Sequence, residues 1–194
     1  MAGGENFQRG LESLQRAQFE EAREAFQQAL AANPDWAEAQ INLGVACLEL
    51  GRVDEAQAAF ERAHQLAPAS EDVYYNLGVV YEKQKRVDDA QTAYEKARAL
   101  RPTVPETRCN LGNIYREKGL LEQAVEEYRA AVDLQPYFAL AHNNLAVTYA
   151  MLSDFESAGY HAQIARALGY EVHPDFLSHL RAALEKRKKE LGLP

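Results

Sequence analysis

The chain has 194 residues, enough for one or two compact domains or for one elongated repeat array. Its net charge of −8 argues against nucleic-acid binding, because phosphate recognition depends on Lys and Arg, and it suits neutral or basic protein partners. Two cysteines without a CxxC pair argue against a disulfide framework and indicate a reducing compartment.

The amino-terminal segment MAGGENFQRG lacks a basic region followed by an apolar core, so it does not read as a signal peptide. No apolar run in the sequence approaches the roughly 18–20 residues of a membrane span. We therefore expect a cytoplasmic protein with no membrane insertion.

A unit of 34 residues repeats along the chain, with a proline at the same place in four copies. With these prolines as the register, the repeats cover residues 3–36, 37–70, 71–104, 105–138 and 139–172. The prolines are Pro34, Pro68, Pro102 and Pro136. A fixed period of this length indicates an array in which each unit stacks on its neighbours.

Each repeat is predicted to form two helices. In the second repeat, apolar residues have helical spacing over 37–50 and again over 53–67. Gly51 lies near the end of the first helix, Asp54 suits the N-cap or first turn of the second, and Pro68 follows the second helix. No β-rich run appears, so we predict an all-α chain.

Small and aromatic residues recur at fixed positions of the unit. A Gly column lies in the first helix (Gly10, Gly44, Gly78 and Gly112), and an aromatic column lies in the second (Phe26, Phe60, Tyr94 and Tyr128). A residue without a side chain lets the partner helix approach to the short end of the roughly 8–10 Å range, and the large side chains fill the remaining space. The last repeat has Ala146 and Ala162 in these columns.

This pattern resembles the tetratricopeptide repeat (TPR) family over about 170 of the 194 residues. The resemblance implies a right-handed superhelical solenoid of five helix-turn-helix repeats. The first repeat is atypical, since Arg9 stands where Leu is usual, and the fifth is degenerate, since Ala162 replaces the aromatic residue and Tyr170 occupies the proline column. Terminal repeats are expected to deviate because they have only one neighbour.

Residues 174–191 are predicted to form one more helix, with Phe176, Leu180, Leu184 and Leu191 on one face. By the resemblance, this is a capping helix that covers the last repeat. From residue 174 on, five Lys or Arg against three Asp or Glu make +2, whereas the preceding residues have 16 against 26 and carry −10. The basic face is either a solvated surface or a contact site for acidic partners or a membrane surface.

No constellation typical of an enzyme is present. The sequence has no GxGxxG, GxxxxGK[ST] or HExxH motif, and Cys109 has no recognisable nucleophile–base arrangement. His142 and His161 fall on the two helices of the last repeat and could approach each other. Half-buried histidines without a metal are the simpler interpretation. We expect no catalytic residue, no metal site and no cofactor.

By the resemblance, the first helices line a concave groove, with one Asn per repeat from the second repeat on. An Asn side chain offers both an acceptor and donors, which matches a peptide backbone, and related TPR proteins use such an Asn ladder. The alternative is a packing role, with each amide bonded to the neighbouring helix. The predicted groove residues are Asn42, Asn76, Asn110, Asn144, Tyr75, Val79, Asn113, Glu38, Asp72, Glu106, Lys83 and Arg116.

These residues predict a non-enzymatic protein–protein interaction adaptor that binds an extended, neutral to basic peptide segment in its groove. The column before the Asn has no Lys, which argues against a clamp for a C-terminal carboxylate. The alternative is a self-assembling scaffold, which organises a multiprotein complex through its ends or convex surface as a homo-oligomer. The thin amino-terminal cap around Arg9 favours that alternative.

Overall fold

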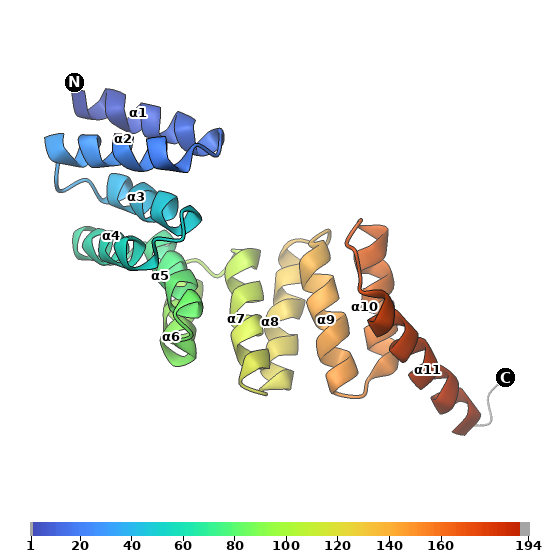
Figure 1. Ribbon diagram of the computed structural model, residues 1–194. Coiled ribbons are helices and arrows are strands. Elements are labelled where there is room, and N and C mark those ends of the chain that lie inside the picture. The colour runs from blue at the N-terminus through green and yellow to red at the C-terminus, as the bar shows by residue number, and fades with distance from the viewer. Residues whose placement is uncertain (1, 191–194) are drawn as a thin grey trace. The chain divides into compact units, whose positions relative to one another are not determined.

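A computed structural model describes residues 2–190 (Figure 1). Every regular element in this range is a helix, so the predicted all-α class is confirmed. The helices are α1 (Ala2–Gln15), α2 (Phe19–Ala32), α3 (Ala37–Glu49), α4 (Val53–Leu66), α5 (Glu71–Lys83), α6 (Val87–Leu100), α7 (Pro105–Glu117), α8 (Leu121–Leu134), α9 (Ala139–Met151), α10 (Phe155–Ala167) and α11 (Pro174–Glu190).

Consecutive helices pack as hairpins within two compact units, the first ending at Pro102 and the second starting at Thr103. In the first unit, α1 packs with α2, α3 with α4 and α5 with α6, and α2 and α4 each contact the hairpin that follows. In the second unit, α7 packs with α8 and α9 with α10, and α11 contacts α10. Each unit is therefore a stack of helix-turn-helix repeats.

The Gly and aromatic columns meet inside each hairpin, as the sequence predicts. A Cβ atom added to Gly44 would lie 2.5 Å from the Phe60 ring, and one added to Gly78 would lie 2.5 Å from the Tyr94 ring. Both rings are fully buried. Only glycine lets the first helix come this close to the ring, which explains why two residues 16 positions apart recur together.

The turn inside each hairpin has one left-handed residue at the same place in every repeat. In the second repeat it is Gly51, with φ +72°, and the next backbone N–H donates to Cys47 O at 2.8 Å, which ends α3. Lys85 occupies the same place in the third repeat with φ +61°. Glycine adopts this conformation without a steric penalty, whereas Lys does not.

The prolines lie just beyond the second helices, as predicted: α4 ends at Leu66 before Pro68, and α6 ends at Leu100 before Pro102. Asp54 lies in the first turn of α4 rather than at its N-cap, which is Arg52. Acidic side chains in the first turn interact favourably with the helix dipole.

Helix α11 covers the last repeat through its apolar face. Leu180 is buried with Ala146, Ala158 and Ala162, and Phe176, Leu177 and Leu184 pack around them. Leu191, which the sequence places in the same stripe, lies outside the described residues. No described helix combines the length and apolar character needed to cross a membrane.

Candidate functional site

Asn42 on α3 and Asn76 on α5 have the same environment in the first unit. Both side chains are half-buried, and each Nδ2 donates to the backbone carbonyl four residues earlier, at 2.9 Å to Glu38 O and 2.7 Å to Asp72 O. Because a carbonyl only accepts, the amide nitrogen must face the helix. Each Asn therefore keeps its Oδ1 atom and its second N–H for another partner.

The acidic residues near these amides differ in their pairing. Glu38 is exposed, whereas Asp72 accepts a hydrogen bond from Arg101 at 3.0 Å. Arg101 also donates to Glu71, which is buried, and this bond is the main reason why the pKa of the guanidinium is raised. The negative charge of this surface is thus partly compensated at Asp72 and uncompensated at Glu38.

The other predicted residues of α5 lie around Asn76. Tyr75 is half-buried, and its ring centroid is 5.9 Å from that of Tyr94. Val79 packs against the buried core of α3–α6 and remains half-buried, while Lys83 is exposed at the last turn of α5. An aromatic side chain, a branched aliphatic one and an amide therefore occur on a single helix.

The second unit uses two of its predicted amides differently. Asn144 on α9 is only 6% exposed, and its Nδ2 donates to Asn113 Oδ1 on α7 at 3.1 Å and to Cys109 Sγ at 3.5 Å. The Tyr128 hydroxyl donates to the same Asn113 oxygen at 2.7 Å. These bonds tie α7, α8 and α9 together, so Asn113 and Asn144 serve packing in this structure.

The remaining predicted residues of the second unit lie on α7. Asn110 and Arg116 are half-buried, and Glu106 is exposed in the first turn. The four Asn residues of the repeated column are not equivalent in their hydrogen bonds. Asn42 and Asn76 bond to their own helices, whereas Asn144 bonds across to a neighbouring one.

Both cysteines are free and buried. Burial raises the pKa of the Cys109 thiol to about 11, an effect that the Asn144 amide only partly offsets. Burial also raises the pKa of Cys47. Neither thiol is activated as a thiolate, because burial favours the neutral form of both.

His142 and His161 do meet, with their Nδ1 atoms 2.9 Å apart. His142 Nε2 lies 3.1 Å from Pro136 O, and a carbonyl accepts only, so this nitrogen carries the proton and donates. His142 Nδ1 then accepts from the N–H of His161. Burial, together with His142 and Arg129, lowers the pKa of His161 to about 4. The described residues contain no group of three or more His, Cys, Asp or Glu arranged to hold a metal ion.

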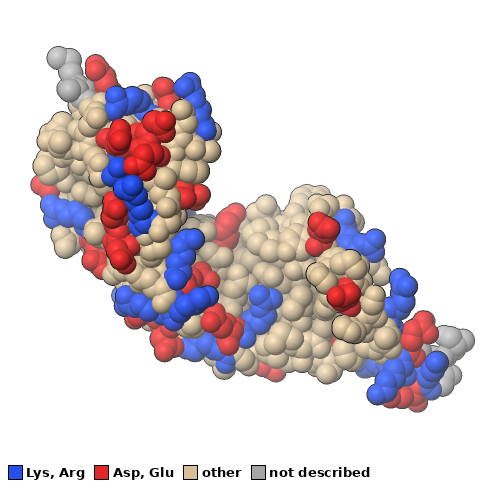
Figure 2. Space-filling view, viewed as in Figure 1, with Lys and Arg blue, Asp and Glu red and all other residues tan. Residues whose placement is uncertain are grey.

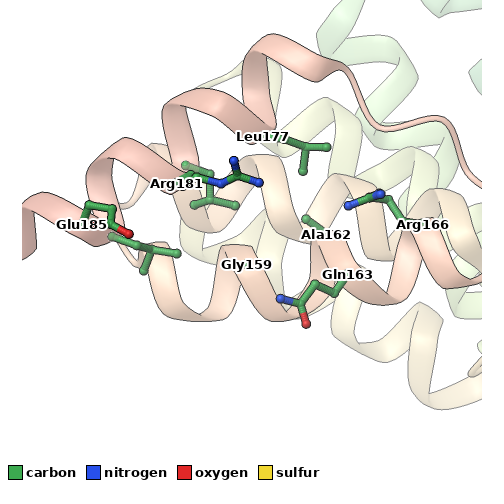
Figure 3. Close-up of a pocket in the computed structure, with 9 residues that line it drawn as sticks. Gly159, Ala162, Gln163, Arg166, Leu177, Arg181 and Glu185 are labelled. Atoms are coloured by element: carbon green, nitrogen blue, oxygen red, sulfur yellow. The ribbon is translucent and has the colours of Figure 1, made fainter. Parts of the chain in front are cut away.

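Sequence reasoning missed a hollow of about 320 Å³ between α10 and α11 (Figure 3). Leu177, Leu180 and Leu184 of α11 line it together with Gly159 and Ala162 of α10. The signal was Ala162, which stands where earlier repeats have a ring. Together with Gly159, Ala162 gives the α10 side of the hollow very small side chains.

Charge is distributed unevenly over the helices. On the face shown in Figure 2, charged side chains are dense over α1–α6 and sparse over α7–α10. Helix α9 has no charged residue, yet its Leu140 and Met151 are 40% and 53% exposed. These two side chains give α9 an exposed apolar part.

Comparison with known proteins agrees with this architecture. Models described as "Tetratricopeptide repeat" match residues 7–71 and 51–106, and one described as "TPR repeat" matches residues 112–153. No curated protein matches the chain by sequence.

Several solved structures share the fold at low sequence identity. PilF of Pseudomonas aeruginosa is 22% identical with a TM-score of 0.85, and the match covers 96% of this chain and 86% of the PilF chain. PilW, described as a widely conserved type IV pilus biogenesis factor, is 21% identical with a TM-score of 0.83, covering 94% and 86%. MamA of Desulfovibrio magneticus RS-1 is 24% identical with a TM-score of 0.77, covering 87% and 95%. With its repeated hairpins and these matches, the chain belongs to the tetratricopeptide repeat family.

Proposed function

We propose that this TPR protein is a non-enzymatic adaptor that binds an extended peptide segment along its first helices. The observation that carries the proposal is the equivalence of Asn42 and Asn76. Both amides are anchored to their own helix by one N–H, so both present Oδ1 in a repeated orientation. Asn is a poor helix former, and in the part of the chain that the structure describes neither side chain forms a hydrogen bond to a neighbouring helix.

The spacing of the repeats suits a peptide backbone. Helices α3 and α5 contact each other, and packed helices are about 8–10 Å apart. Three residues of extended chain span about 10 Å. One Asn per repeat would therefore meet every third residue of an extended segment, accepting from its N–H and donating to its C=O, with little dependence on side chains.

Selectivity would come from the neighbouring side chains. Tyr75 and Val79 offer apolar contact beside Asn76, and Glu38 leaves uncompensated negative charge beside Asn42. A neutral to basic segment is therefore the favoured ligand. In the second unit, Asn113 and Asn144 would instead support the hairpins by packing α7 against α9.

The test is a selection of short random peptides on the wild-type protein, followed by affinity measurement on variants. We expect the double variant Asn42→Ala, Asn76→Ala to bind the selected peptides at least about tenfold more weakly, because each lost amide removes two hydrogen bonds. The matched control is Asn33→Ala, which removes an exposed amide from the α2–α3 loop. Equal affinity of the double variant and wild type would refute the ligand role of these amides.

Self-association is a second candidate, favoured by the apolar side chains exposed in the second unit. Tyr137 is 79% exposed, Tyr160 63% and Met151 53%. Exposed apolar surface of this kind often marks an association site. Light scattering over a concentration series decides between the two candidates, since a strict monomer at high concentration excludes the scaffold.

A further inference from the structure

The hollow between α10 and α11 combines an apolar floor with two arginines at its rim. Leu180 and Ala162 are buried at its base, and Leu177 and Leu184 are half-buried on its α11 side. Arg166 of α10 and Arg181 of α11 are exposed, and their guanidinium groups point toward one another across the hollow (Figure 3). The site thus has the composition of a ligand pocket, largely apolar with a few charged groups.

The two guanidinium groups lack an acidic partner. Neither Arg166 nor Arg181 forms an ion pair with any side chain that the structure describes, although Glu185 also lines the hollow. By contrast, several arginines of the first unit form ion pairs, such as Arg62 with Asp35 at 2.5 Å and Arg86 with Asp89 at 2.7 Å. Two guanidinium groups that point toward one another repel each other, and a bound anion reduces this repulsion.

We propose that this hollow binds an acidic amphipathic helix of another protein. Its apolar side chains would enter between α10 and α11 and contact the three leucines, and its carboxylates would pair with Arg166 and Arg181. A helix is the fitting shape because the hollow runs between two helices, where a third can lie alongside. Charge complementarity favours an acidic partner, since the charged side chains that line the hollow are Arg166 and Arg181 against Glu185 alone.

This site is independent of the surface around Asn42 and Asn76 and has the opposite charge preference. The first helices of the first unit favour a neutral to basic segment because of Glu38, whereas the α10–α11 hollow favours an acidic one. A chain with both sites would connect two different proteins rather than bind one. The failure of either proposal leaves the other standing, because the two sets of residues do not overlap.

The direct test uses three synthetic peptides of about 12 residues with the same helical spacing of leucines. Their polar positions are Glu, Gln or Lys, and binding is measured by fluorescence anisotropy. We expect the Glu peptide to bind at least about tenfold more tightly than the Lys peptide, with the Gln peptide between them. Equal binding of the Glu and Lys peptides, or no binding of any, overturns the proposal.

Two pairs of variants localise the binding. The double variant Arg166→Gln, Arg181→Gln should lower the affinity for the Glu peptide at least about tenfold. Its control, Lys186→Gln with Lys189→Gln, removes the same charge from exposed positions of α11 that do not line the hollow. Gly159→Leu should fill the hollow and abolish binding without unfolding α10, since Leu is a better helix former than Gly. Gly159→Ala is its control, because the added Cβ would lie 3.6 Å from Leu184 Cδ1, an ordinary contact.

The same variants distinguish a second copy of this chain as the occupant. If the hollow receives another copy, the wild-type protein will associate on concentration, and Gly159→Leu will make it monomeric in sedimentation experiments. That result, or an equal effect of the two charge variants on the Glu peptide, would overturn the assignment of an acidic partner helix.

Discussion

Asn144 on α9 donates a hydrogen bond to the side chain of Asn113 on α7 at 3.1 Å, and Asn113 is also the acceptor for the Tyr128 hydroxyl. One amide of the repeated column is thus part of the packed interior of its unit. Asn42 and Asn76, at the same place in their repeats, bond only to their own helices among the contacts that the structure records. The repeated residue therefore has two hydrogen-bonding patterns, whose contributions mutation can separate.

Replacing Asn144 with Ala should lower the free energy of unfolding by about 1–3 kcal/mol, because it removes a buried hydrogen bond and leaves a small cavity. Asn42→Ala and Asn76→Ala should change it by no more than about 0.5 kcal/mol, since Ala is the better helix former and the lost bond is exposed. Urea unfolding of the three variants measures both effects. A loss at Asn76 as large as that at Asn144 would show that the whole column serves packing.

The glycine columns predict a contrast between two positions. Gly78→Ala should destabilise the protein by about 1–3 kcal/mol, because the added Cβ would lie 2.5 Å from the buried Tyr94 ring. Gly159→Ala should stabilise it by about 0.5–1 kcal/mol, because no ring opposes it and Ala favours the helix. Thermal melting of both variants gives the comparison. Equal shifts in one direction would contradict the close approach at Gly78.

The hairpin packing could be predicted from the sequence because it depends on residues at fixed offsets. Gly44 and Phe60 meet in the structure for the same reason that Gly78 and Tyr94 do: one hairpin geometry is repeated. The first-turn position of Asp54 and the approach of His142 to His161 follow from the same register. Each contact lies within one hairpin, where separation along the chain determines separation in space.

The roles of the Asn residues could not be predicted in this way, because they depend on the facing residue of another repeat. Asn144 finds an acceptor because the preceding repeat has Asn113. The column that contains Asn113 has Val45 in the second repeat, which offers no acceptor to Asn76. The hollow beside α11 escaped prediction for a similar reason, since the sequence shows that Ala162 lacks a ring but not where α11 lies.

Lys85 predicts a stabilising substitution. Its φ of +61° is a left-handed conformation that a residue with a side chain adopts at a cost, and Gly51 and Gly119 fill the same place in the flanking repeats. Lys85→Gly should raise the free energy of unfolding by about 0.5–1 kcal/mol in urea titration. The reciprocal change Gly51→Ala should lower it by a similar amount. A loss of stability in Lys85→Gly would show that the Lys side chain contributes more than its backbone conformation costs.

His161 makes the second unit sensitive to acid. Its ring is stacked on Tyr149 and lies against His142, and burial beside His142 and Arg129 lowers its pKa to about 4, below the value near 6.5 of an unfolded chain. The unfolded state therefore takes up the proton first as the pH falls. Stability should decrease from about pH 6.5 toward pH 4, and the decrease should be complete once the folded ring is also protonated.

The measurement is the urea midpoint of wild type and of His161→Gln at intervals between pH 7.5 and pH 4.5. Gln does not titrate, and its amide can donate to His142 Nδ1 in place of the ring N–H. The variant should show a flatter pH profile than wild type across this window. Asp154, whose pKa is lowered by its hydrogen bond to Ser157, also loses stabilisation as the pH falls below about 5, but it does so equally in both proteins, so the difference between their profiles reports His161. Parallel profiles for the two proteins would contradict the low pKa of His161.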